Sequence, residues 1–512
     1  MSDPRSARYS GLMRSLAALL VGAALTLAFA PYGLWPLAVI CPAALMALWT
    51  QASRPREGAW LGFCFGLGLF AAGTWWLYIS IRVFGQAPLW VALLVMGALV
   101  LIMAGWYALL GFAVLRLLPV RGSWNLLAAV PAMWLLVEWC RGWFLSGFPW
   151  LSLGYSQTGT WLAGFAPVGG VYLVSALLLV AAGALVTLWR GKGRQRLVAL
   201  ALLLLPWPAG LALRSVEWTR PDAAPRTVAI VQGAIPQDMK WLETNRQNIL
   251  DEYARLHHEA LGAALIVWPE SALPDLANLL PQYLGGIWSA SEKAGSAVLM
   301  GVMRFEEGAP RGAENYYNSV LALGEGEAAF YDKRHLVPFG EYFPVPDWVR
   351  SWLRLLSLPN SDFTAGADEQ PPLALGGFSA ATSICYEDAY PAALRRAARA
   401  ANLLVNVTND AWFGRSSARY QHLQITRMRA AEARRPLLRA ANDGVSAVIG
   451  PRGEIQAAAA EFTPAVLRAQ VHTRSGDTPY LVAGNWPIIS IAGLLVAWVT
   501  RRRWKLPRPA PV

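Results

Sequence analysis

The sequence is poor in cysteine, histidine and charge for its length. Its 512 residues include only four Cys and five His, and charged side chains make up 15% of the total. It contains no Cys/His spacing typical of a zinc site, no glycine-rich phosphate loop, no repeat array and no low-complexity tract. These absences argue against a zinc protein, a P-loop nucleotide enzyme and a repeat scaffold, and we expect neither a metal ion nor a cofactor.

Hydrophobic side chains, in contrast, make up 55% of the sequence, and 25 residues are Trp. This composition is too apolar for an ordinary soluble protein. The apolar residues concentrate in 12–213 and 480–500, while the stretch between them has the composition of a soluble domain. We therefore predict an N-terminal membrane domain (1–220), a soluble domain (221–478) and a C-terminal span with a basic tail (479–512).

About eight apolar segments have the roughly 17 to 30 residues that a helix needs to cross a bilayer. Seven precede the soluble domain and one follows it. The fifth has Glu138 and Arg141 near its end, and the sequence leaves the role of these two charged residues open. The predicted spans are residues 12–30, 34–50, 59–80, 88–117, 124–140, 165–189, 196–213 and 481–500.

Basic residues indicate how these spans are oriented. With the N-terminus in the cytoplasm, the inner loops and the tail carry sixteen Lys and Arg residues against two acidic ones, while the outer loops carry little beyond Arg82 and Arg141. Positive charge accumulates on the cytoplasmic side of membrane proteins, so we predict that both termini are cytoplasmic and that the soluble domain lies outside. The inner loops then account for the net charge of +12. Because the charge balance leaves no basic face on the soluble domain, we expect no nucleic-acid partner.

Only one of the four cysteines, Cys385, lies in the soluble domain. Cys41, Cys64 and Cys140 lie in or beside predicted spans, where we expect them to pack. No disulfide can therefore form within the soluble domain. An unpaired Cys in an oxidising compartment is a candidate reactive thiol, although a lone Cys is more often a small buried hydrophobe.

Short β-like runs alternate with helix-like stretches in the soluble domain. Several runs are continuously apolar, which indicates strands buried on both faces. Strands that alternate with helices predict an α/β sandwich. The predicted strands are 227–233, 265–269, 297–302, 317–323, 329–333, 379–385, 403–407, 446–450 and 465–471, and the predicted helices are 243–263, 279–294, 388–401 and 417–435.

Three chemically useful side chains each follow or end one of these strands. Cys385 ends the run 378–385 before a helix-like stretch, whose amide dipoles we expect to favour the attacking thiolate. Glu270 follows the strand 265–269, and a carboxylate in such a partly buried setting can act as a base near neutral pH. Lys333 ends its strand before a loop and could hold a developing oxyanion. Taken singly, each residue has an ordinary structural alternative.

Taken together, a Glu, a Lys and a Cys in this chain order and with these neighbours resemble the nitrilase/amidase superfamily of carbon-nitrogen hydrolases. The resemblance implies an αββα sandwich with a Glu–Lys–Cys triad. It makes Glu270 the general base, Lys333 the oxyanion stabiliser and Cys385 the nucleophile. A second carboxylate, Glu341, matches the extra Glu often found beside such triads.

The chain as a whole resembles the apolipoprotein N-acyltransferases, the membrane branch of that superfamily. The resemblance lies in the arrangement of spans around an outer nitrilase-like domain and in the phrases at 231–241, 385–387 and 406–414. It implies an enzyme of the bacterial inner membrane with a periplasmic catalytic domain. We expect a monomer, but the sequence leaves the oligomeric state open. An acyl chain would move from a phospholipid, typically phosphatidylethanolamine, through a Cys thioester to the α-amine of a diacylglyceryl apolipoprotein.

Further residues are predicted to line or support the site. Trp241, Tyr386 and Glu387 belong to the quoted phrases, although core packing would explain them too. The segment 346–359 places Trp352 and other large apolar residues on one helix face. We predict a mobile arm that dips into the membrane interface, and the alternative is a helix packed on the domain core.

Two other functions stay open at this point. A membrane-anchored amidase or nitrilase that uses water would share the Glu–Lys–Cys set, but one span would be enough to anchor it. A transporter or lipid-binding protein with an outer sensor domain usually carries charges or Gly/Pro breaks near mid-span. The few charges here, such as Glu138 and Arg141, lie near a span end instead.

Overall fold

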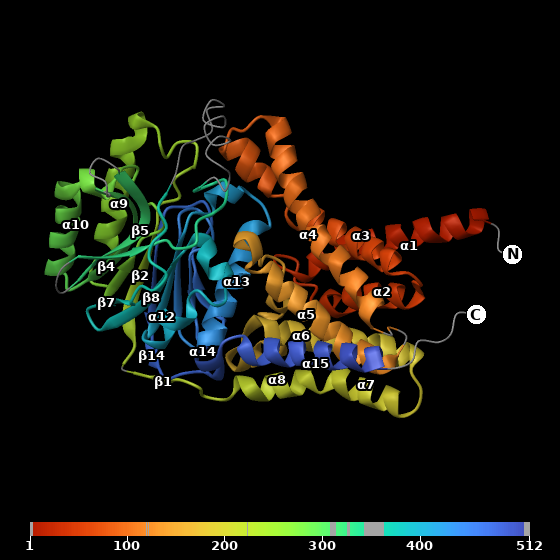
Figure 1. Ribbon diagram of the computed structural model, residues 1–512. Helices are drawn as coiled ribbons and strands as arrows, with labels where there is room; N and C mark the ends of the chain where they lie inside the picture. The colour runs from red at the N-terminus through yellow and green to blue at the C-terminus, as the bar shows by residue number, and fades with distance from the viewer. Residues whose placement is uncertain are drawn as a thin grey trace. The chain divides into compact units, whose positions relative to one another are not determined.

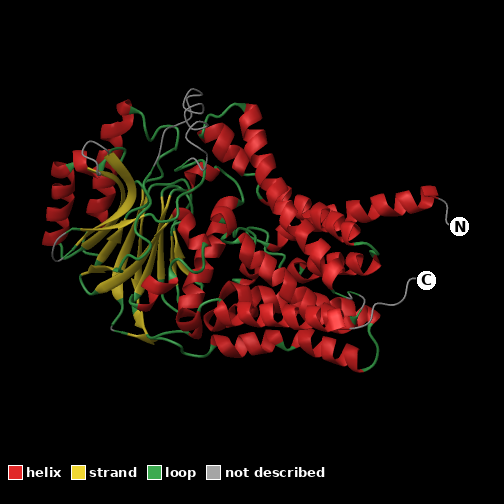
Figure 2. Cartoon of the chain, in the orientation of Figure 1, coloured by secondary structure: helices red, strands yellow, loops and turns green. Residues whose placement is uncertain are grey.

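The computed structural model describes residues 4–505, apart from 119, 121, 223, 308–313, 325–327 and 343–362. The predicted arm, with Trp352, therefore lies outside the described residues. The chain divides into two compact units (Figures 1 and 2). The helical unit consists of Met1–Tyr78, Leu89–Val216 and Ala483–Val512, and the α/β unit consists of Ile79–Pro88 and Glu217–Val482.

The helical unit is built from long apolar helices. Its α3 and α4 pack closely because glycines remove side chains from the contact. A β-carbon added at Gly62 would lie 2.1 Å from the carbonyl oxygen of Tyr107, and one at Gly58 would lie 2.6 Å from that of Gly111. The helices are α1 (Pro4–Leu25), α2 (Leu37–Gln51), α3 (Pro55–Gly73), α4 (Leu89–Leu117), α5 (Val130–Arg141), α6 (Ala166–Arg190), α7 (Arg194–Leu204), α8 (Pro206–Arg214) and α15 (Trp486–Lys505).

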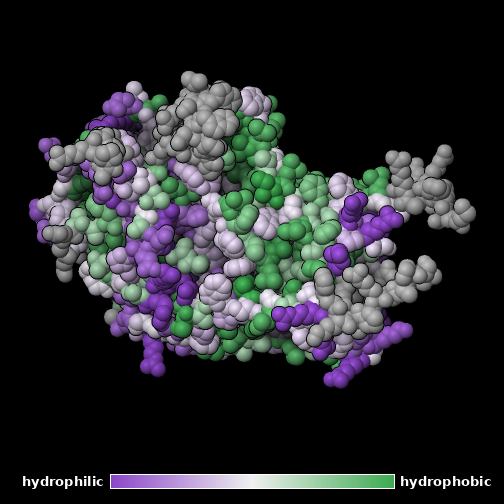
Figure 3. All heavy atoms as spheres, in the orientation of Figure 1, coloured by the Kyte–Doolittle hydropathy of each residue, from purple (hydrophilic) through white to green (hydrophobic). Residues whose placement is uncertain are grey.

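Four helical segments among the described residues are long and apolar enough to cross a membrane: Ser10–Ala28, Leu89–Leu117, Trp161–Arg190 and Arg194–Arg214. Helix α2 has 15 residues and α5 only 12. Large apolar side chains lie exposed on this unit, and the hydrophobic surface of Figure 3 spreads over it. Exposed apolar surface of this extent is typical of a membrane-facing helix bundle.

The charged pair at the end of α5 organises the irregular chain that follows that helix. Arg141 donates to the carbonyl oxygens of Phe148 (2.5 Å) and Trp150 (2.8 Å), while Glu138 accepts from the backbone N–H of Leu153 (3.1 Å) and from the Ser175 hydroxyl (2.5 Å). Glu138 and Arg141 are both buried. They satisfy backbone groups that lack helical partners, which gives them a structural role inside the helical unit.

The α/β unit contains two six-stranded sheets packed face to face. The first has the order β13-β2-β3-β4-β5-β6 and the second has the order β12-β11-β10-β9-β8-β7. A two-stranded sheet pairs β1 (Arg220–Pro221) with β14 (Arg474–Ser475). The strands are β2 (Arg226–Gln232), β3 (Leu265–Val267), β4 (Ala297–Glu307), β5 (Glu314–Leu323), β6 (Ala329–Asp332), β7 (Leu373–Leu375), β8 (Phe378–Ile384), β9 (Leu403–Thr408), β10 (Leu437–Ala441), β11 (Ala447–Ile449), β12 (Ile455–Ala458) and β13 (Ala465–Val471).

Helices cover the outer face of each sheet, so the layers are helix, sheet, sheet and helix (Figures 1 and 2). Helices α9 (Arg246–Ala260) and α10 (Pro281–Lys293) lie on the first sheet, and α12 (Arg395–Arg399) and α13 (Ala418–Ala433) lie on the second. Strand β2 shows why several predicted strands are continuously apolar: both of its faces are buried. Its Val228 and Ile230 enter the core between the sheets, while Ala229 and Val231 enter the core beneath the helices. The predicted αββα sandwich is confirmed.

The structure differs from the sequence prediction at particular elements. Strands β1, β7, β10, β12 and β14 were not predicted, and the predicted helix 388–401 reduces to the short turn η9 (Cys385–Ala389) and the five-residue α12. Pro391 interrupts that helix because proline lacks a backbone donor and clashes with the preceding turn.

The α/β unit also contains the π-helical turn η2 (Ile79–Phe84), where the Ser80 hydroxyl donates to the carbonyl oxygen of Trp412 (2.8 Å).

Candidate functional site

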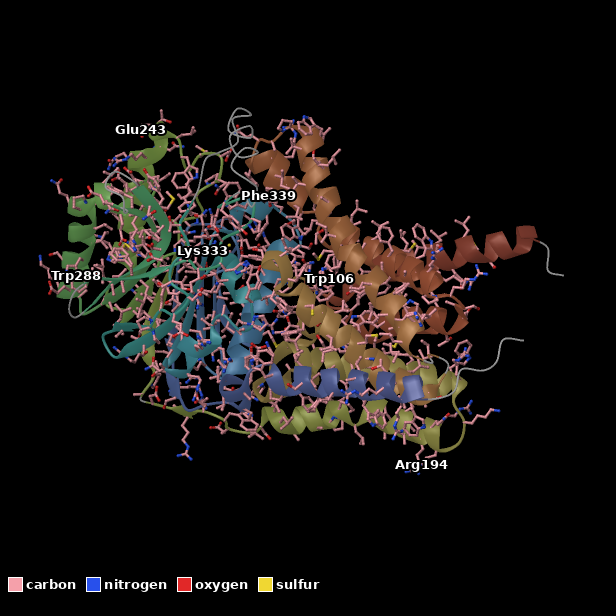
Figure 4. The ribbon with its side chains drawn as sticks, in the orientation of Figure 1. Trp106, Arg194, Glu243, Trp288, Lys333 and Phe339 are labelled. Carbon is pink, nitrogen blue, oxygen red and sulfur yellow. The ribbon has the colours of Figure 1, made fainter. Side chains whose placement is uncertain are left out.

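Glu270, Lys333 and Glu341 meet in the α/β unit, although they come from separate parts of the chain. Glu270 follows β3, and Lys333 directly follows β6. The Nζ atom of Lys333 lies 2.8 Å from Oε1 of Glu341 and 3.6 Å from Oε1 of Glu270. Lys333 is buried, whereas Phe339 in the loop after it is half exposed. Both residues are labelled in Figure 4. The structure thus brings together the base, the cation and the second carboxylate that the sequence singled out.

Amide groups orient the Glu270 carboxylate. Its Oε1 accepts from the Asn318 side chain (2.8 Å), and its Oε2 accepts from the backbone N–H of Asn409 (2.8 Å). Asn318 also donates to Oε1 of Glu341 (3.0 Å), so one amide links the two carboxylates. These hydrogen bonds fix the orientation of the Glu270 carboxylate.

Lys333 is held as an ammonium. Burial alone would lower the pKa of Lys333, but the carboxylates of Glu341 and Glu270 outweigh burial and raise that pKa overall. Glu341 is itself fixed, because its Oε2 accepts from the backbone N–H of Val337 (2.8 Å). A buried, permanently charged amine between two carboxylates is suited to stabilising negative charge on a bound group.

Cys385 lies at the end of β8 and interacts electrostatically with both Glu270 and Lys333. It is half-buried and its backbone adopts a left-handed conformation, with φ at 53°. Burial raises the pKa of the Cys385 thiol well above its ordinary value, and the Glu270 carboxylate raises it further, whereas Lys333 and a hydrogen bond with Thr408 act in the opposite direction. The resting residue is therefore a neutral thiol.

The expectation that helix dipoles favour the Cys385 thiolate is wrong. The helix that follows Cys385 is the single turn η9, which is too short to develop an appreciable dipole. Burial and the nearby carboxylate together outweigh the cation Lys333. A base that removes the thiol proton is therefore needed before Cys385 can attack.

Glu387 braces the end of β8. It is buried, and its Oε2 accepts from the backbone N–H of Ile384 (2.8 Å) and from the Tyr331 hydroxyl (2.9 Å). Its Oε1 accepts from the backbone N–H groups of Arg334 (2.8 Å) and His335 (3.1 Å). Glu387 thus ties the turn that carries Cys385 to the loop that follows Lys333.

Trp241 and Tyr386 lie at the margins of this cluster. The Trp241 side chain is 48% exposed, and the loop that carries it is tied to the site through Asn409, whose side chain donates to Oε1 of Gln237 (2.8 Å). The ring of Tyr386 lies 5.1 Å from that of Tyr390 in an edge-to-face arrangement. Trp241 is accessible enough to meet a ligand, whereas Tyr386 belongs to a small aromatic group.

Sequence reasoning missed several polar residues at the site. Asn409 lies in the phrase 406–414, which was noted only for its resemblance, and Asn318 carried no signal because it stands inside an apolar strand. Lys240 is buried, and its Nζ finds no hydrogen-bond partner among the described residues. Burial lowers the pKa of Lys240 to about 8, although Glu270 and Asp443 partly oppose the shift. Across the described part of the chain, no group of His, Cys, Asp and Glu residues is arranged to hold a metal ion.

The fold and the grouping of Glu270, Lys333 and Cys385 define the carbon-nitrogen hydrolase class, and residues 227–480 match the family described as carbon-nitrogen hydrolase. Residues 21–184 match the apolipoprotein N-acyltransferase N-terminal domain. The chain is 43% identical to the apolipoprotein N-acyltransferase of Azotobacter vinelandii, over 97% of both chains. It is 41% identical to that of Chromobacterium violaceum (98% of this chain and 97% of the relative) and 38% identical to that of Vibrio parahaemolyticus (96% and 98%).

The chain belongs to the apolipoprotein N-acyltransferase family. The resemblance inferred from the sequence is thereby confirmed. Both halves of the chain contribute to the match, since the N-terminal helices and the α/β unit each correspond to a family of their own.

Proposed function

We propose that this enzyme transfers an acyl chain from a phospholipid to the α-amino group of the diacylglyceryl-cysteine of an apolipoprotein. The observation that carries the proposal is the convergence of Glu270, Lys333 and Cys385 in a chain that matches apolipoprotein N-acyltransferases over nearly its whole length. Phosphatidylethanolamine is the proposed donor, and a monomer is the proposed active form.

In the first half-reaction, Glu270 takes the proton of the Cys385 thiol, and the thiolate attacks the ester carbonyl of the phospholipid. Lys333 and the backbone N–H of Tyr386 hold the tetrahedral oxyanion. The C–O bond then breaks, and Glu270 returns the proton to the departing lysophospholipid. An acyl thioester on Cys385 remains. The raised pKa of the thiol supports this order of events, because a neutral Cys385 needs a base.

In the second half-reaction, the neutral α-amine of the apolipoprotein attacks the thioester carbonyl. The same oxyanion donors act again, the C–S bond breaks, and Glu270 carries the amine proton to the departing thiolate. The amide product leaves and Cys385 regains its proton. Water must be kept from the thioester during this sequence, since it would hydrolyse the intermediate.

The membrane arrangement belongs to the same proposal. We infer seven spans within 1–220, a periplasmic catalytic domain at 221–478, and one final span with a basic cytoplasmic tail within 479–512. The four apolar helical segments and the strong bias of Lys and Arg to one set of loops support this topology. A bacterial inner membrane would supply both lipid substrates. The arm at 346–359, with Trp352, stays a prediction.

The test uses the full-length enzyme in phospholipid vesicles with a diacylglyceryl apolipoprotein. We expect a gel shift of the lipoprotein together with loss of its free N-terminal amine. Release of free fatty acid without amine modification would instead indicate a membrane-anchored amidase or hydrolase. Absence of any acyl-enzyme and of any product would favour a transporter or lipid-binding protein.

A further inference from the structure

A cluster of buried charged residues lies directly behind Cys385 and has no part in the proposed proton transfers. We call it the buried cluster: Asp388 from η9, Asp410 from η10 (Asp410–Phe413), His422 from α13 and Arg439 from β10. Each of the four is at most 1% exposed. Burying charged groups is costly unless each finds good partners, so the contacts of this cluster indicate what it holds in place.

His422 contacts the carbonyl oxygen of the nucleophile itself. Its Nε2 lies 3.1 Å from the backbone oxygen of Cys385 and 3.0 Å from Oδ1 of Asp388. Its Nδ1 lies 2.9 Å from Oδ1 of Asp410 and 3.0 Å from Nη2 of Arg439. A backbone carbonyl and an ionised carboxylate only accept hydrogen bonds. Nε2 faces only acceptors and is therefore the donor to the Cys385 carbonyl. A second proton on Nδ1, shared with Asp410, makes the ring an imidazolium.

The charges around His422 favour that state. Burial lowers its pKa and so does Arg439, but Asp388 and Asp410 more than compensate and raise the pKa of His422 to about 9. Arg439 in turn donates to Oδ2 of Asp410 (2.7 Å), and these partners hold the pKa of Asp410 well below its usual range. The two carboxylates of the cluster thus face its two basic side chains.

The carbonyl that His422 contacts belongs to a backbone conformation that needs support. Cys385 has φ at 53°, a region that residues with a β-carbon rarely adopt. Its carbonyl oxygen also accepts from the side chain of Asn406 (3.3 Å). Two donors therefore hold this one oxygen, and strained residues persist only where surrounding contacts over-determine them.

The Cys385 carbonyl and the Tyr386 N–H belong to the same peptide group. A trans peptide is planar, and its C=O and N–H point in opposite directions. Whatever fixes the Cys385 carbonyl therefore also fixes where the Tyr386 N–H points. A positively charged donor on the oxygen polarises the amide and makes its N–H a stronger donor.

The thiol end of Cys385 is linked to the same cluster. The Thr408 hydroxyl donates to Oδ1 of Asp410 (3.1 Å) and also forms a hydrogen bond with the Cys385 side chain. Asp410 is thus connected to the thiol through Thr408 and to the carbonyl through His422. One rigid network orients both reactive parts of the residue.

We propose that His422 is a positioning residue for the oxyanion site: its imidazolium orients and polarises the Cys385–Tyr386 peptide so that the Tyr386 N–H points at the reacting carbonyl oxygen. The inference rests on the proposed function, because it assigns this N–H to the oxyanion of acyl transfer. It adds a role for a charged residue that stands outside the Glu–Lys–Cys set.

The test compares His422→Gln with His422→Asn in the full-length enzyme. The amide nitrogen of Gln reaches close to the position of Nε2 and can still donate to the Cys385 carbonyl, while the shorter Asn side chain reaches only the position of Nδ1. We expect His422→Asn to slow formation of the Cys385 thioester from phospholipid by about ten- to a hundred-fold, with KM unchanged, which is below the loss from deleting an oxyanion donor. His422→Gln should recover only part of this loss, because its amide donates to the carbonyl but carries no charge.

Melting temperatures of the two variants provide the control. A purely structural His422 predicts that both variants lose rate in proportion to their loss of melting temperature, and that result would overturn the inference. Normal loading by a folded His422→Asn variant would overturn it as well. Failure of the wild type to form any thioester would count against the proposed function instead, so the two failures are distinguishable.

A second measurement needs only the wild type. Thioester formation requires the oxyanion site, whereas alkylation of Cys385 by iodoacetamide requires only the thiolate. Loss of the second His422 proton removes the charge that polarises the peptide but leaves the Nε2 donor. We therefore expect loading to fall to the level of His422→Gln as the pH rises through about 9, the pKa of His422, while alkylation continues to increase. Two rates that rise together through this range would contradict the inference, even if both variants failed to fold.

Discussion

The two units of this protein bury polar groups for different purposes. In the helical unit, Glu138 and Arg141 satisfy backbone groups of one irregular segment, and the rest of the interior is largely apolar. In the α/β unit, charged side chains gather where β3, β6 and β8 end, and they contact one another. The first arrangement stabilises a fold, whereas the second costs stability in order to hold reactive groups together.

The difference teaches where to look for chemistry in a chain of this composition. Apolar helices pack through small residues, so a change there alters stability first. The strand ends of the sandwich carry Glu270, Lys333 and Cys385, so a change there alters activity first. Mutations can separate these effects, and the expected outcomes follow from the largest to the smallest effect on activity.

Replacing the nucleophile gives the largest expected effect. Cys385→Ala should abolish both the acyl-enzyme and lipoprotein acylation, because no other group can form the thioester, and the melting temperature should change little. Mass spectrometry of the enzyme after incubation with phospholipid measures the first, and the lipoprotein gel shift measures the second. The matched control is Cys140→Ala in the helical unit, which should stay active. A Cys385→Ala enzyme that still forms an acyl-enzyme would remove this residue from the mechanism.

The partners of Cys385 come next. Glu270→Gln and Lys333→Ala should each slow turnover by roughly two to three orders of magnitude, the usual scale for a general base or an oxyanion donor. Glu341→Ala should also impair turnover severely, since Glu341 holds the Lys333 ammonium. Initial rates of acyl transfer at saturating phospholipid measure these effects. Arg429→Lys, at the buried ion pair with Glu432 on α13, is the control for general electrostatic damage.

The rate of Cys385 alkylation tests how the charges of Glu270 and Lys333 shift the pKa of the thiol, because the two charges act in opposite directions. The Glu270 carboxylate raises the pKa of the thiol and the Lys333 ammonium lowers it. Glu270→Gln should therefore lower the thiol pKa and increase the rate of iodoacetamide labelling at pH 8, because the thiolate fraction rises about tenfold when the pKa falls by one. Lys333→Ala should decrease that rate. Changes of the same sign in both variants would show that access, and not charge, governs the thiol.

Packing in the helical unit gives the smallest expected effect on chemistry. Gly62→Ala would place a β-carbon 2.1 Å from the Tyr107 carbonyl oxygen, whereas Gly97 on α4 has no atom within 4 Å of such a carbon. We expect Gly62→Ala to destabilise the enzyme by about 1–3 kcal/mol, measured as a lower melting temperature in detergent. Gly97→Ala should be neutral. The protein that remains folded should load Cys385 normally in both variants, and a selective loss of loading rate in Gly62→Ala would mean that the two units are not separable in this way.

Local sequence was sufficient to predict those strands and helices whose pattern of apolar residues matches their burial in the fold. Strands β2, β3, β8 and β9 are short apolar runs because both of their faces are buried, and α9 and α13 were recognisable as helix-forming stretches. Strand β10 was missed because Leu437–Ala441 is rich in Ala and contains Arg439, which is typical of a helix. It becomes a strand because its backbone pairs with β9 on one side and β11 on the other, while Asp410 and Asn406 accept hydrogen bonds from the buried guanidinium.

The sequence by itself therefore determined the class of fold, the family and the identity of the chemically useful residues, since each depends on residue types that stand next to one another in the chain. Only the tertiary structure decided the ionisation of those residues. The thiol of Cys385 is neutral because it is buried and lies beside the Glu270 carboxylate, and Lys333 is charged because carboxylates from distant segments lie beside it. His422 contacts the Cys385 carbonyl for the same reason: a helix 37 residues further along the chain packs behind the turn, and no local pattern encodes that distance.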